Sequence, residues 1–147
     1  MKPSRIKSVL DRLWEARWPA FLWGPPGTGK SSIVREAAAQ RKLEVVDIRA
    51  PLLDPTDLRG IPHVHEGRAE WCPPSFLPTE EQEGILFFDE LNAAPPLVQA
   101  SLYQLTLDRR VGEYRLPDGW RIVAAGNRDQ DGAVTFKMPS ALANRFI

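Results

Sequence analysis

The stretch Gly24-Pro25-Pro26-Gly27-Thr28-Gly29-Lys30-Ser31 decides how the rest of the chain is interpreted. It matches G-x-x-x-x-G-K-[ST], a pattern in which the backbone N–H groups of a glycine-rich loop wrap a phosphate. The apolar run Ala20–Trp23 before it predicts a buried strand, and residues 30–40 after it are rich in helix formers. A strand, a phosphate loop and a helix N-terminus in this order indicate a nucleoside triphosphate site.

Within this loop, we expect Lys30 to reach the β- and γ-phosphates and the Ser31 hydroxyl to ligate Mg²⁺. A turn that contains Lys and Ser by chance is the alternative, and the predicted strand and helix on either side argue against it. The expected ligands are therefore ATP and Mg²⁺. The predicted nucleotide-binding residues are Gly24, Pro25, Pro26, Gly27, Thr28, Gly29, Lys30, Ser31, Ser32 and Asp89, with Ser31 and Asp89 at the metal.

Two carboxylates follow the continuous apolar run 85–88, which predicts a strand covered on both faces. Asp89, at the end of that strand, can hold Mg²⁺ through its water shell. Glu90 beside it can polarise the attacking water as a general base. Taken alone, this pair of carboxylates is explained equally well by solvated residues at a strand end and by a catalytic site. Combined with the phosphate loop, it predicts NTP hydrolysis.

Two further residues complete the predicted catalytic set of Glu90, Asn127 and Arg145. Asn127 ends a fourth predicted strand, 120–125, and its amide can orient the water between Glu90 and the γ-phosphate. A turn-forming Asn after a glycine is the competing interpretation. Arg145 can stabilise charge on the transferring phosphoryl group. Its spacing alone favours a helix-terminal or surface role instead.

The rest of the chain alternates predicted strands with predicted helices, which favours a doubly wound, mostly parallel α/β sheet of the P-loop NTPase type with flanking helices. Ligands bind beyond the carboxyl ends of the strands in such sheets. Further helices are expected over 6–14, ended by Pro19, and over 95–108 and 139–145, with a strand over 43–48.

Turn residues dominate between 51 and 83, where we expect a short helix near Asp57 and a small hairpin around Gly67. Residues 111–116 are expected to form a hairpin arm, with its turn at Pro117-Asp118-Gly119. This hairpin precedes the fourth core strand.

The composition of the chain argues against several classes of function. The 147 residues suit one domain, and Lys plus Arg equals Asp plus Glu at 19 each, so no net basic field favours nucleic acid. No apolar run is long enough to span a bilayer. The single cysteine fits a reducing cytoplasm, where we expect the protein to reside. His63, His65 and Cys72 match no standard zinc spacing and lack a fourth ligand.

The same signals occur in this order in the AAA+ ATPases. From about Trp18 to Phe146 the chain resembles their MoxR-type branch, of the dynein-related AAA subfamily. Residues 24–31 match the Walker A motif, 85–90 match Walker B, and Asn127 matches sensor 1. Leu91-Asn92 fits the Asp-Glu-Ile-Asn pattern of the branch, with Leu in place of Ile. Residues 57–60 and the later hairpin are also similar to elements of the branch, and residues 142–146 resemble the segment that carries the arginine finger.

The resemblance implies a ring, usually a hexamer, with ATP at subunit interfaces, so that Arg145 acts on the neighbour's nucleotide. It also implies mechanical work on protein substrates, with a von Willebrand factor A domain partner. AAA+ modules continue into a fifth strand and a helical lid, whereas this sequence stops at Ile147. We therefore expect residues 1–147 to be the large AAA+ subdomain without its lid, with an unpaired edge beside the first core strand, weak hydrolysis alone and a tendency to associate.

Three other functions stay open at this stage. An ATP-responsive binding module uses the same loop with little turnover. A GTPase usually carries Asn-Lys-x-Asp, whereas Asn127 is followed by Arg128, Asp129 and Gln130. A DNA-linked role lacks support from the net charge.

Overall fold

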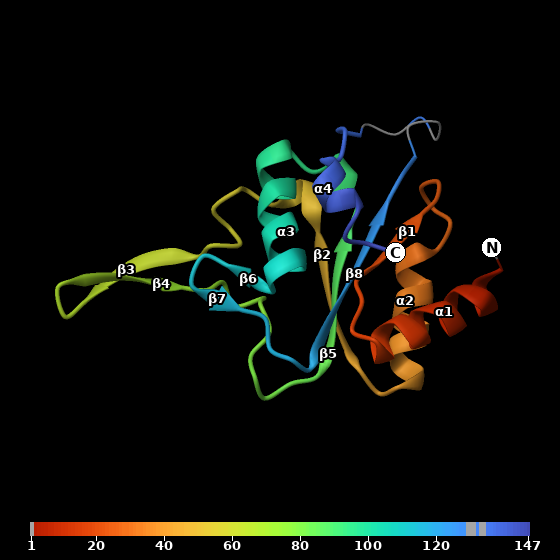
Figure 1. Ribbon diagram of the computed structural model, residues 1–147, viewed down its shortest axis with the longest axis horizontal. Helices are drawn as coiled ribbons and strands as arrows, with labels where there is room; N and C mark the ends of the chain where they lie inside the picture. The colour runs from red at the N-terminus through yellow and green to blue at the C-terminus, as the bar shows by residue number, and fades with distance from the viewer. Residues whose placement is uncertain (1, 129–131, 133–134) are drawn as a thin grey trace.

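The computed structural model describes residues 2–128, 132 and 135–147 (Figure 1). Asp129 and Gln130, which bear on guanine recognition, lie outside these ranges. The elements in chain order are α1 (Pro3–Glu15), β1 (Ala20–Trp23), α2 (Lys30–Gln40), β2 (Glu44–Arg49), the 3-10 turn η1 (Ala50–Leu52), β3 (Ile61–His65), β4 (Arg68–Cys72), β5 (Gly84–Asp89), the 3-10 turn η2 (Leu91–Ala93), α3 (Pro96–Asp108), β6 (Arg110–Val111), β7 (Tyr114–Arg115), β8 (Trp120–Gly126) and α4 (Ser140–Ala143).

A parallel sheet forms the centre of the described part of the chain. Its strand order is β1-β8-β5-β2, and each neighbouring pair runs parallel. The carboxyl ends of these strands therefore lie along one edge, at the top of Figure 1. β8 lies between β1 and β5, so it connects the strand before the glycine loop with the strand before Glu90. The predicted doubly wound parallel sheet is confirmed.

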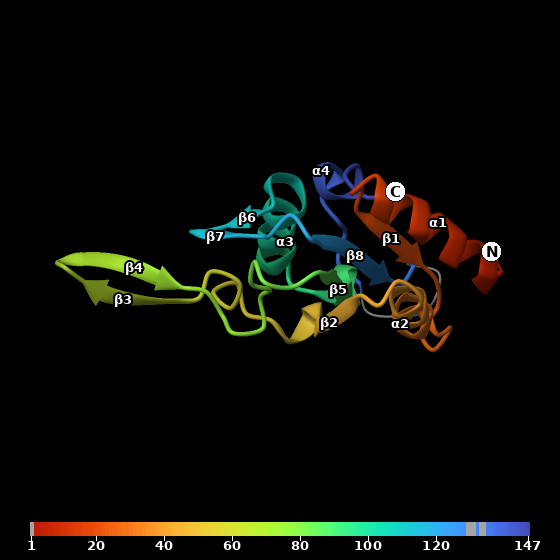
Figure 2. The same ribbon diagram turned by 90° about the horizontal axis from the view of Figure 1, so that it is seen from below.

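Alternate side chains of β5 enter two different cores, because successive side chains of a strand point to opposite faces. Ile85 and Phe87 pack with the residues of α1 and α2, and Leu86 and Phe88 pack with those of α3. All four are fully buried. Figure 2 shows the two helical layers on opposite sides of the sheet. Cover on both faces explains why the run 85–88 has no polar residue.

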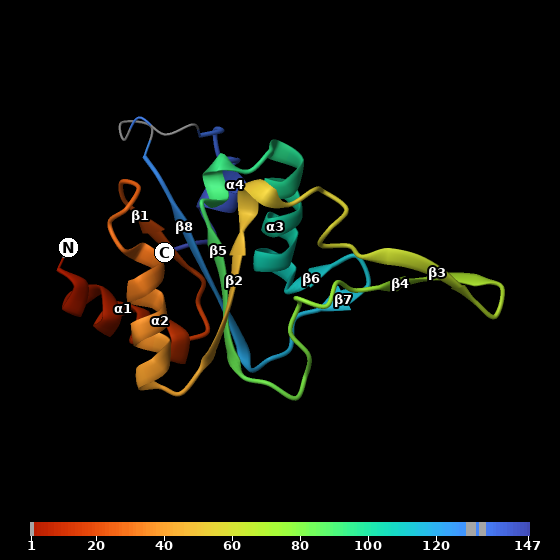
Figure 3. The ribbon, with the colours of Figure 1, turned by 180° about the vertical axis from the view of Figure 1, so that it is seen from behind.

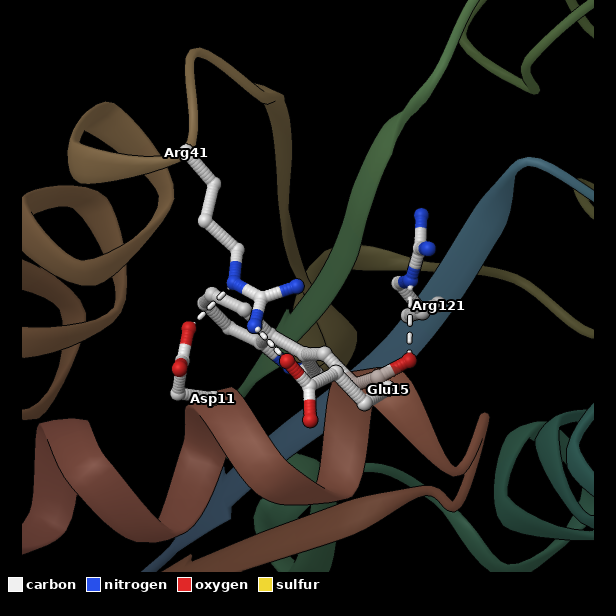
Figure 4. Close-up of polar contacts among 5 residues, drawn as sticks. Asp11, Glu15, Arg41 and Arg121 are labelled. Atoms are coloured by element: carbon white, nitrogen blue, oxygen red, sulfur yellow. Dashed lines mark hydrogen bonds and ion pairs between the residues drawn. The ribbon is translucent and has the colours of Figure 1, made fainter.

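Polar contacts and a buried aromatic residue attach α1 to the body (Figure 4). Arg41, just after α2, donates hydrogen bonds to the carboxylates of Asp11 and Glu15, the second over 2.7 Å. Arg121 Nε of β8 donates to the carbonyl of Trp14 over 3.2 Å. The Arg41 guanidinium, by hydrogen bonding, holds the pKa of the Asp11 carboxyl below its usual range. Trp14 itself is fully buried.

The hairpin β3–β4 projects from the body, as Figures 1 and 3 show. Its strands are antiparallel, and Ile61 pairs with Cys72 at the base. Every residue of β3 is exposed, with Val64 at 80%. The expectation of a hairpin around Gly67 is confirmed.

Three local predictions are wrong. α1 ends at Glu15, before Pro19, because Arg17 takes a left-handed backbone with φ of 58°. Residues 55–59 form turns and not a helix near Asp57, whose carboxylate accepts a local hydrogen bond from the Asp54 N–H over 2.7 Å. Residues 111–116 are not a single hairpin arm, because both arms of the small hairpin β6–β7 lie within residues 110–115. Its turn lies at residues 112–113, and the turn at 117–119 leads into β8 instead.

The outer edge of β1 is paired at its start, in contrast to the expectation of a bare edge. The N–H of Ile147 donates to the carbonyl of Pro19 over 3.1 Å, and its carbonyl accepts from the Phe21 N–H over 2.8 Å. This is the pattern of parallel strand pairing. The Phe146 ring also packs edge-on against Phe21, with ring centroids 5.3 Å apart.

None of the helices in the described ranges combines the length and the apolar character that crossing a membrane requires.

Candidate functional site

The glycine loop joins β1 to α2, as predicted, and two left-handed glycines shape its backbone. Gly27 has a φ of 75° and Gly29 a φ of 76°. Beyond their chain neighbours, no described atom lies within 4 Å of a Cβ built at either position, so the requirement for glycine is conformational and not steric. The Thr28 hydroxyl donates to the Pro25 carbonyl over 2.8 Å. The loop leads into the N-terminus of α2, whose free N–H groups and dipole favour an anion.

Lys30, the first residue of α2, joins the loop to the end of β8. Its ammonium donates to the carbonyls of Gly24 and Pro25 over 2.7 and 2.8 Å. It also donates to Asn127 Oδ1 over 3.2 Å. Asn127 directly follows β8, which pairs with β1, and its exposed fraction is 3%. The residues predicted to bind phosphate and to orient water are therefore in contact.

Asp89 and Glu90 lie at the carboxyl end of β5 and are half-buried. The Glu90 N–H donates to Asp89 Oδ1 over 2.9 Å, which fixes the Asp89 side chain at the strand end. Glu90 has a left-handed backbone with φ of 53° and ψ of 39°. Such a conformation outside glycine costs about 1 kcal/mol and occurs preferentially at functional sites. The backbone therefore turns sharply at the predicted general base.

An open cleft of about 570 Å³ lies beside the start of α2. Ser31, Ser32 and Asp89 line it, so the two predicted metal ligands face one space. Hydroxyl and carboxylate oxygens suit Mg²⁺, so the residues present fit the expected ion. Sequence reasoning did not single out the other lining residues, which are Arg35, Asp47, Arg49 and Leu52. The β2 strand supplies Asp47 and Arg49, and pattern alone did not indicate its position beside β5.

Asn92, on the turn η2, holds the backbone of Asn127 from both sides. Its Nδ2 donates to the Asn127 carbonyl over 2.6 Å, and its Oδ1 accepts from the Asn127 N–H over 3.1 Å. Its exposed fraction is 3%. The resemblance included Asn92 in a motif without assigning it a contact. Because its partner lies 35 positions later in the chain, no spacing rule finds this pair.

Arg145 lies away from the glycine loop. It lines a cleft of about 470 Å³ with Arg17, Trp18, Thr106 and Arg109, among other residues. Trp18 precedes β1, so this cleft is near the amino end of the strand, whereas the glycine loop follows its carboxyl end. The structure therefore brings together the loop, Asp89, Glu90 and Asn127, and leaves Arg145 apart from them.

His63, His65 and Cys72 share the β3–β4 hairpin with Glu70. Cys72 Sγ lies 3.2 Å from His63 Nδ1, and His65 Nδ1 lies 3.5 Å from Glu70 Oε1. Within the described ranges, no group of three or more His, Cys, Asp or Glu residues is arranged to hold a metal ion. These exposed side chains contact one another as ordinary polar neighbours.

The parallel sheet, the glycine loop after β1 and the carboxylates at the carboxyl end of β5 define a P-loop nucleotide-binding α/β domain. A family model described as "AAA domain (dynein-related subfamily)" matches residues 19–146. The chain belongs to this family of AAA+ proteins, and the expected membership of the MoxR-type branch is confirmed.

Similar proteins agree with this assignment. The chain is 32% identical over 138 residues to "Protein MoxR" of Paracoccus denitrificans, covering 89% of this chain and 40% of the relative. It is 33% identical over 145 residues to "Protein MoxR" of Methylorubrum extorquens, covering 90% and 40%. Among solved structures, NtrX of Brucella abortus in complex with ATP has the same fold, with a TM-score of 0.64 at 21% identity over 97% of this chain and 33% of that one. The chain thus spans less than half the length of these relatives.

Proposed function

We propose that this chain binds ATP with Mg²⁺ and hydrolyses ATP, as the nucleotide-binding core of an AAA+ motor that remodels or assembles partner proteins. The observation that carries the proposal is the 3.2 Å contact between Lys30 Nζ and Asn127 Oδ1. It joins the phosphate-binding loop to the amide expected to orient water. Asp89 ends the strand next to β8 and Glu90 follows it, so a nucleotide on the loop would face all of these groups.

Each residue has a proposed role in this reaction. The loop N–H groups and Lys30 bind the β- and γ-phosphates. Ser31 and Asp89 would hold Mg²⁺, which neutralises phosphate charge when it is bound. Glu90 accepts a proton from the attacking water while Asn127 orients that water. The half-buried positions of Asp89 and Glu90 support these roles, because exclusion of bulk solvent strengthens electrostatic interactions.

Arg145 is proposed to act on the nucleotide of a neighbouring subunit in a ring, most simply a hexamer. Its distance in the fold from its own glycine loop supports action in trans. Protein substrates, a partner with a von Willebrand factor A domain and a cytoplasmic location belong to the same proposal and rest on family membership. Residues 1–147 would supply the α/β subdomain of each subunit.

The test compares phosphate release and ATP binding in wild type and Glu90→Gln. We expect Glu90→Gln to lower the rate of phosphate release about 100-fold, since a lost general base costs at least this much. The dissociation constant for ATP should stay within about threefold, because the loop is unchanged. Glu81→Gln is the matched control, since Glu81 is exposed before the opposite end of β5. Equal rates in wild type and Glu90→Gln would contradict the proposed hydrolysis.

A second candidate function is an ATP-responsive binding module with little turnover. The position of Arg145, away from the loop of its own chain, favours it, because a single chain then lacks the proposed finger. This candidate predicts that ATP binds tightly while wild type and Glu90→Gln release phosphate equally slowly at every protein concentration. The motor predicts instead that the wild-type rate per chain rises with concentration, as neighbouring subunits assemble.

A further inference from the structure

Three separate segments meet at the buried residue Asn92. Its side chain holds both polar groups of the Asn127 backbone, at 2.6 and 3.1 Å. Its own carbonyl accepts a hydrogen bond from the Phe136 N–H over 2.6 Å, which brings in the segment before α4. The third segment is η2, on which Asn92 lies, two residues after Glu90. Asn92 therefore contacts the chain after β8 and the chain before α4 from the turn that follows Glu90.

The contact with Asn92 fixes the orientation of the Asn127 backbone as well as its position. One donor and one acceptor of the same amide bind the N–H and the carbonyl of one residue, so the Asn127 backbone cannot rotate without losing both bonds. The Asn127 side chain leaves that backbone toward Lys30 Nζ. A buried amide costs free energy whenever it loses a hydrogen-bond partner, because a desolvated polar group is then left unpaired. The Asn92 side chain makes both of these hydrogen bonds with Asn127, a residue of the candidate site.

The other end of this link is the turn of Glu90. The N–H of Ala93 donates to the Glu90 carbonyl over 2.9 Å, so Glu90 and Asn92 belong to one closed turn. The left-handed backbone of Glu90 sets the direction in which that turn leaves β5. Asn127 and the backbone that carries the Glu90 carboxylate are therefore linked through the Asn92 side chain and one closed turn.

We propose that Asn92 is a positioning residue that sets the geometry between Glu90 and Asn127, and thereby the rate of hydrolysis, without contacting the nucleotide. This inference rests on the proposed function. Asn92→Asp, in its ionised form, keeps the acceptor for the Asn127 N–H and replaces the donor with an oxygen that repels the Asn127 carbonyl. Asn92→Leu, similar in volume, loses both. The two variants therefore remove one and two of the bonds that hold Asn127.

The test measures turnover, ATP affinity and amide hydrogen exchange at Asn127 in wild type and both variants. We expect Asn92→Leu to lower the rate of phosphate release about ten- to a hundredfold, since small misplacements of reacting groups have effects of this size. Asn92→Asp should fall between Asn92→Leu and wild type. The ATP dissociation constant should stay within about threefold, because Lys30 and the loop are intact. Exchange at the Asn127 N–H should become faster in Asn92→Leu than in Asn92→Asp, which retains its acceptor.

Gln99→Leu is the matched control, because Gln99 is another fully buried amide, on α3, and donates to the Ala94 carbonyl over 3.0 Å. It removes one buried hydrogen bond without changing the contacts of Asn92 with Asn127, so its turnover per folded molecule should stay at the wild-type value. Should Asn92→Leu not fold, Asn92→Asp and Gly126→Ala carry the test. A Cβ at Gly126 would lie 2.5 Å from Asn92 Oδ1 and 2.8 Å from Phe21 Cζ, so it displaces the amide together with the Phe21 ring. Both variants should slow turnover with ATP affinity kept.

The outcomes separate this inference from the proposed function. If wild type hydrolyses ATP and the Asn92 variants release phosphate at the same rate as wild type, the inference is overturned and the proposed function stands. A Gln99→Leu variant whose turnover falls as far as that of Asn92→Leu also overturns the inference alone. A wild type that turns over no faster than Glu90→Gln overturns the proposed function and, with it, the inference.

Discussion

Lys30 donates to three oxygens, two on its own loop and one on Asn127. Phosphate oxygens would replace these acceptors, so nucleotide binding exchanges hydrogen bonds instead of filling an unsatisfied site. A charge-assisted bond to phosphate is stronger than a bond to a neutral carbonyl, which favours the exchange.

The first residue-scale prediction concerns the ammonium of Lys30. Lys30→Ala should weaken ATP binding about ten- to a hundredfold in calorimetric titration, the size expected for lost charged hydrogen bonds. Lys42→Ala is the control, because Lys42 is an exposed lysine beyond the far end of α2. Equal ATP affinity in wild type and Lys30→Ala would show that the loop does not bind phosphate as proposed.

A second residue-scale prediction concerns Tyr114, whose hydroxyl donates to the Pro78 carbonyl over 2.7 Å. Burial raises the pKa of Tyr114 to about 12, so folding favours the protonated phenol. Its stabilisation is therefore complete below pH 10, the ordinary value, and is lost as pH rises through about 12. Tyr114→Phe should lower the free energy of unfolding by about 1 kcal/mol at pH 8, and this difference should shrink toward pH 12.

Denaturant unfolding across this pH range checks the prediction. Tyr103→Phe, at the other tyrosine of the chain, serves as the reference for general alkaline effects. A Tyr114→Phe difference that stays constant from pH 8 to 12 would mean that the phenol does not titrate as described.

At the residue scale, the sequence predicts position and backbone well where a motif fixes both residue type and conformation, as in the loop at 24–31 between β1 and α2. Asp89 and Glu90 are predictable because they end an unbroken apolar strand. Asn92 is not, because its contact with Asn127 depends on the direction that the backbone takes at Glu90. No property of the Glu side chain specifies a left-handed φ there.

At the scale of elements, α1 is attached to the body by packing more than by charge. Arg41, Asp11 and Glu15 are partly exposed, at 28%, 50% and 66% of their side-chain surface, and water screens such pairs. Trp14, by contrast, is fully buried in the core beneath α1 and α2. Solvent exposure therefore decides which of these contacts stabilises the helix.

The corresponding prediction compares two variants in urea unfolding. Trp14→Ala should lower the free energy of unfolding by about 3–5 kcal/mol, through lost burial and the cavity left behind. Arg41→Ala should lower it by less than about 1 kcal/mol. A larger loss in Arg41→Ala than in Trp14→Ala would mean that the ion pairs hold α1 in place.

Elements were predictable where hydrophobic period and punctuation agree. Both β1 and α2 have the predicted bounds, since Gly24 and the loop separate them cleanly. The sequence predicts the wrong turn for β6–β7 because Pro117-Asp118-Gly119 is the stronger turn signal, although Gly112 supplies the tighter turn with φ of 56°. The local sequence shows which segments favour turns. Tertiary packing decides at which of these segments the chain reverses direction.

At the scale of the whole molecule, the β3–β4 hairpin is an appendage and not part of the core. Outside its own pairing, Trp71 connects it to the body, since the Trp71 N–H donates to Glu113 Oε2 over 3.1 Å and Arg59 lies 5.4 Å from the Trp71 ring centroid. Ile61 and Cys72 are paired, so the chain enters and leaves the hairpin at adjacent points.

Replacing residues 61–72 by a short Gly-Ser linker should therefore lower the free energy of unfolding by less than about 2 kcal/mol, the sum expected for one hydrogen bond and one exposed cation–π contact. ATP affinity should be unchanged, because the glycine loop lies at the end of a different strand. Thermal unfolding and ATP titration test both statements. Loss of cooperative unfolding would show that the hairpin belongs to the folding unit.

The left-handed backbone of Glu90 has a consequence for how this chain responds to selection. Glycine and, to a lesser degree, asparagine tolerate that conformation better than glutamate. In a library randomised at position 90 and sorted only for heat resistance, we expect glycine to be enriched and glutamate to be lost. Sorting the same library for growth that depends on the protein's work should return glutamate. The residue proposed as the general base is thus one that selection for stability alone would remove.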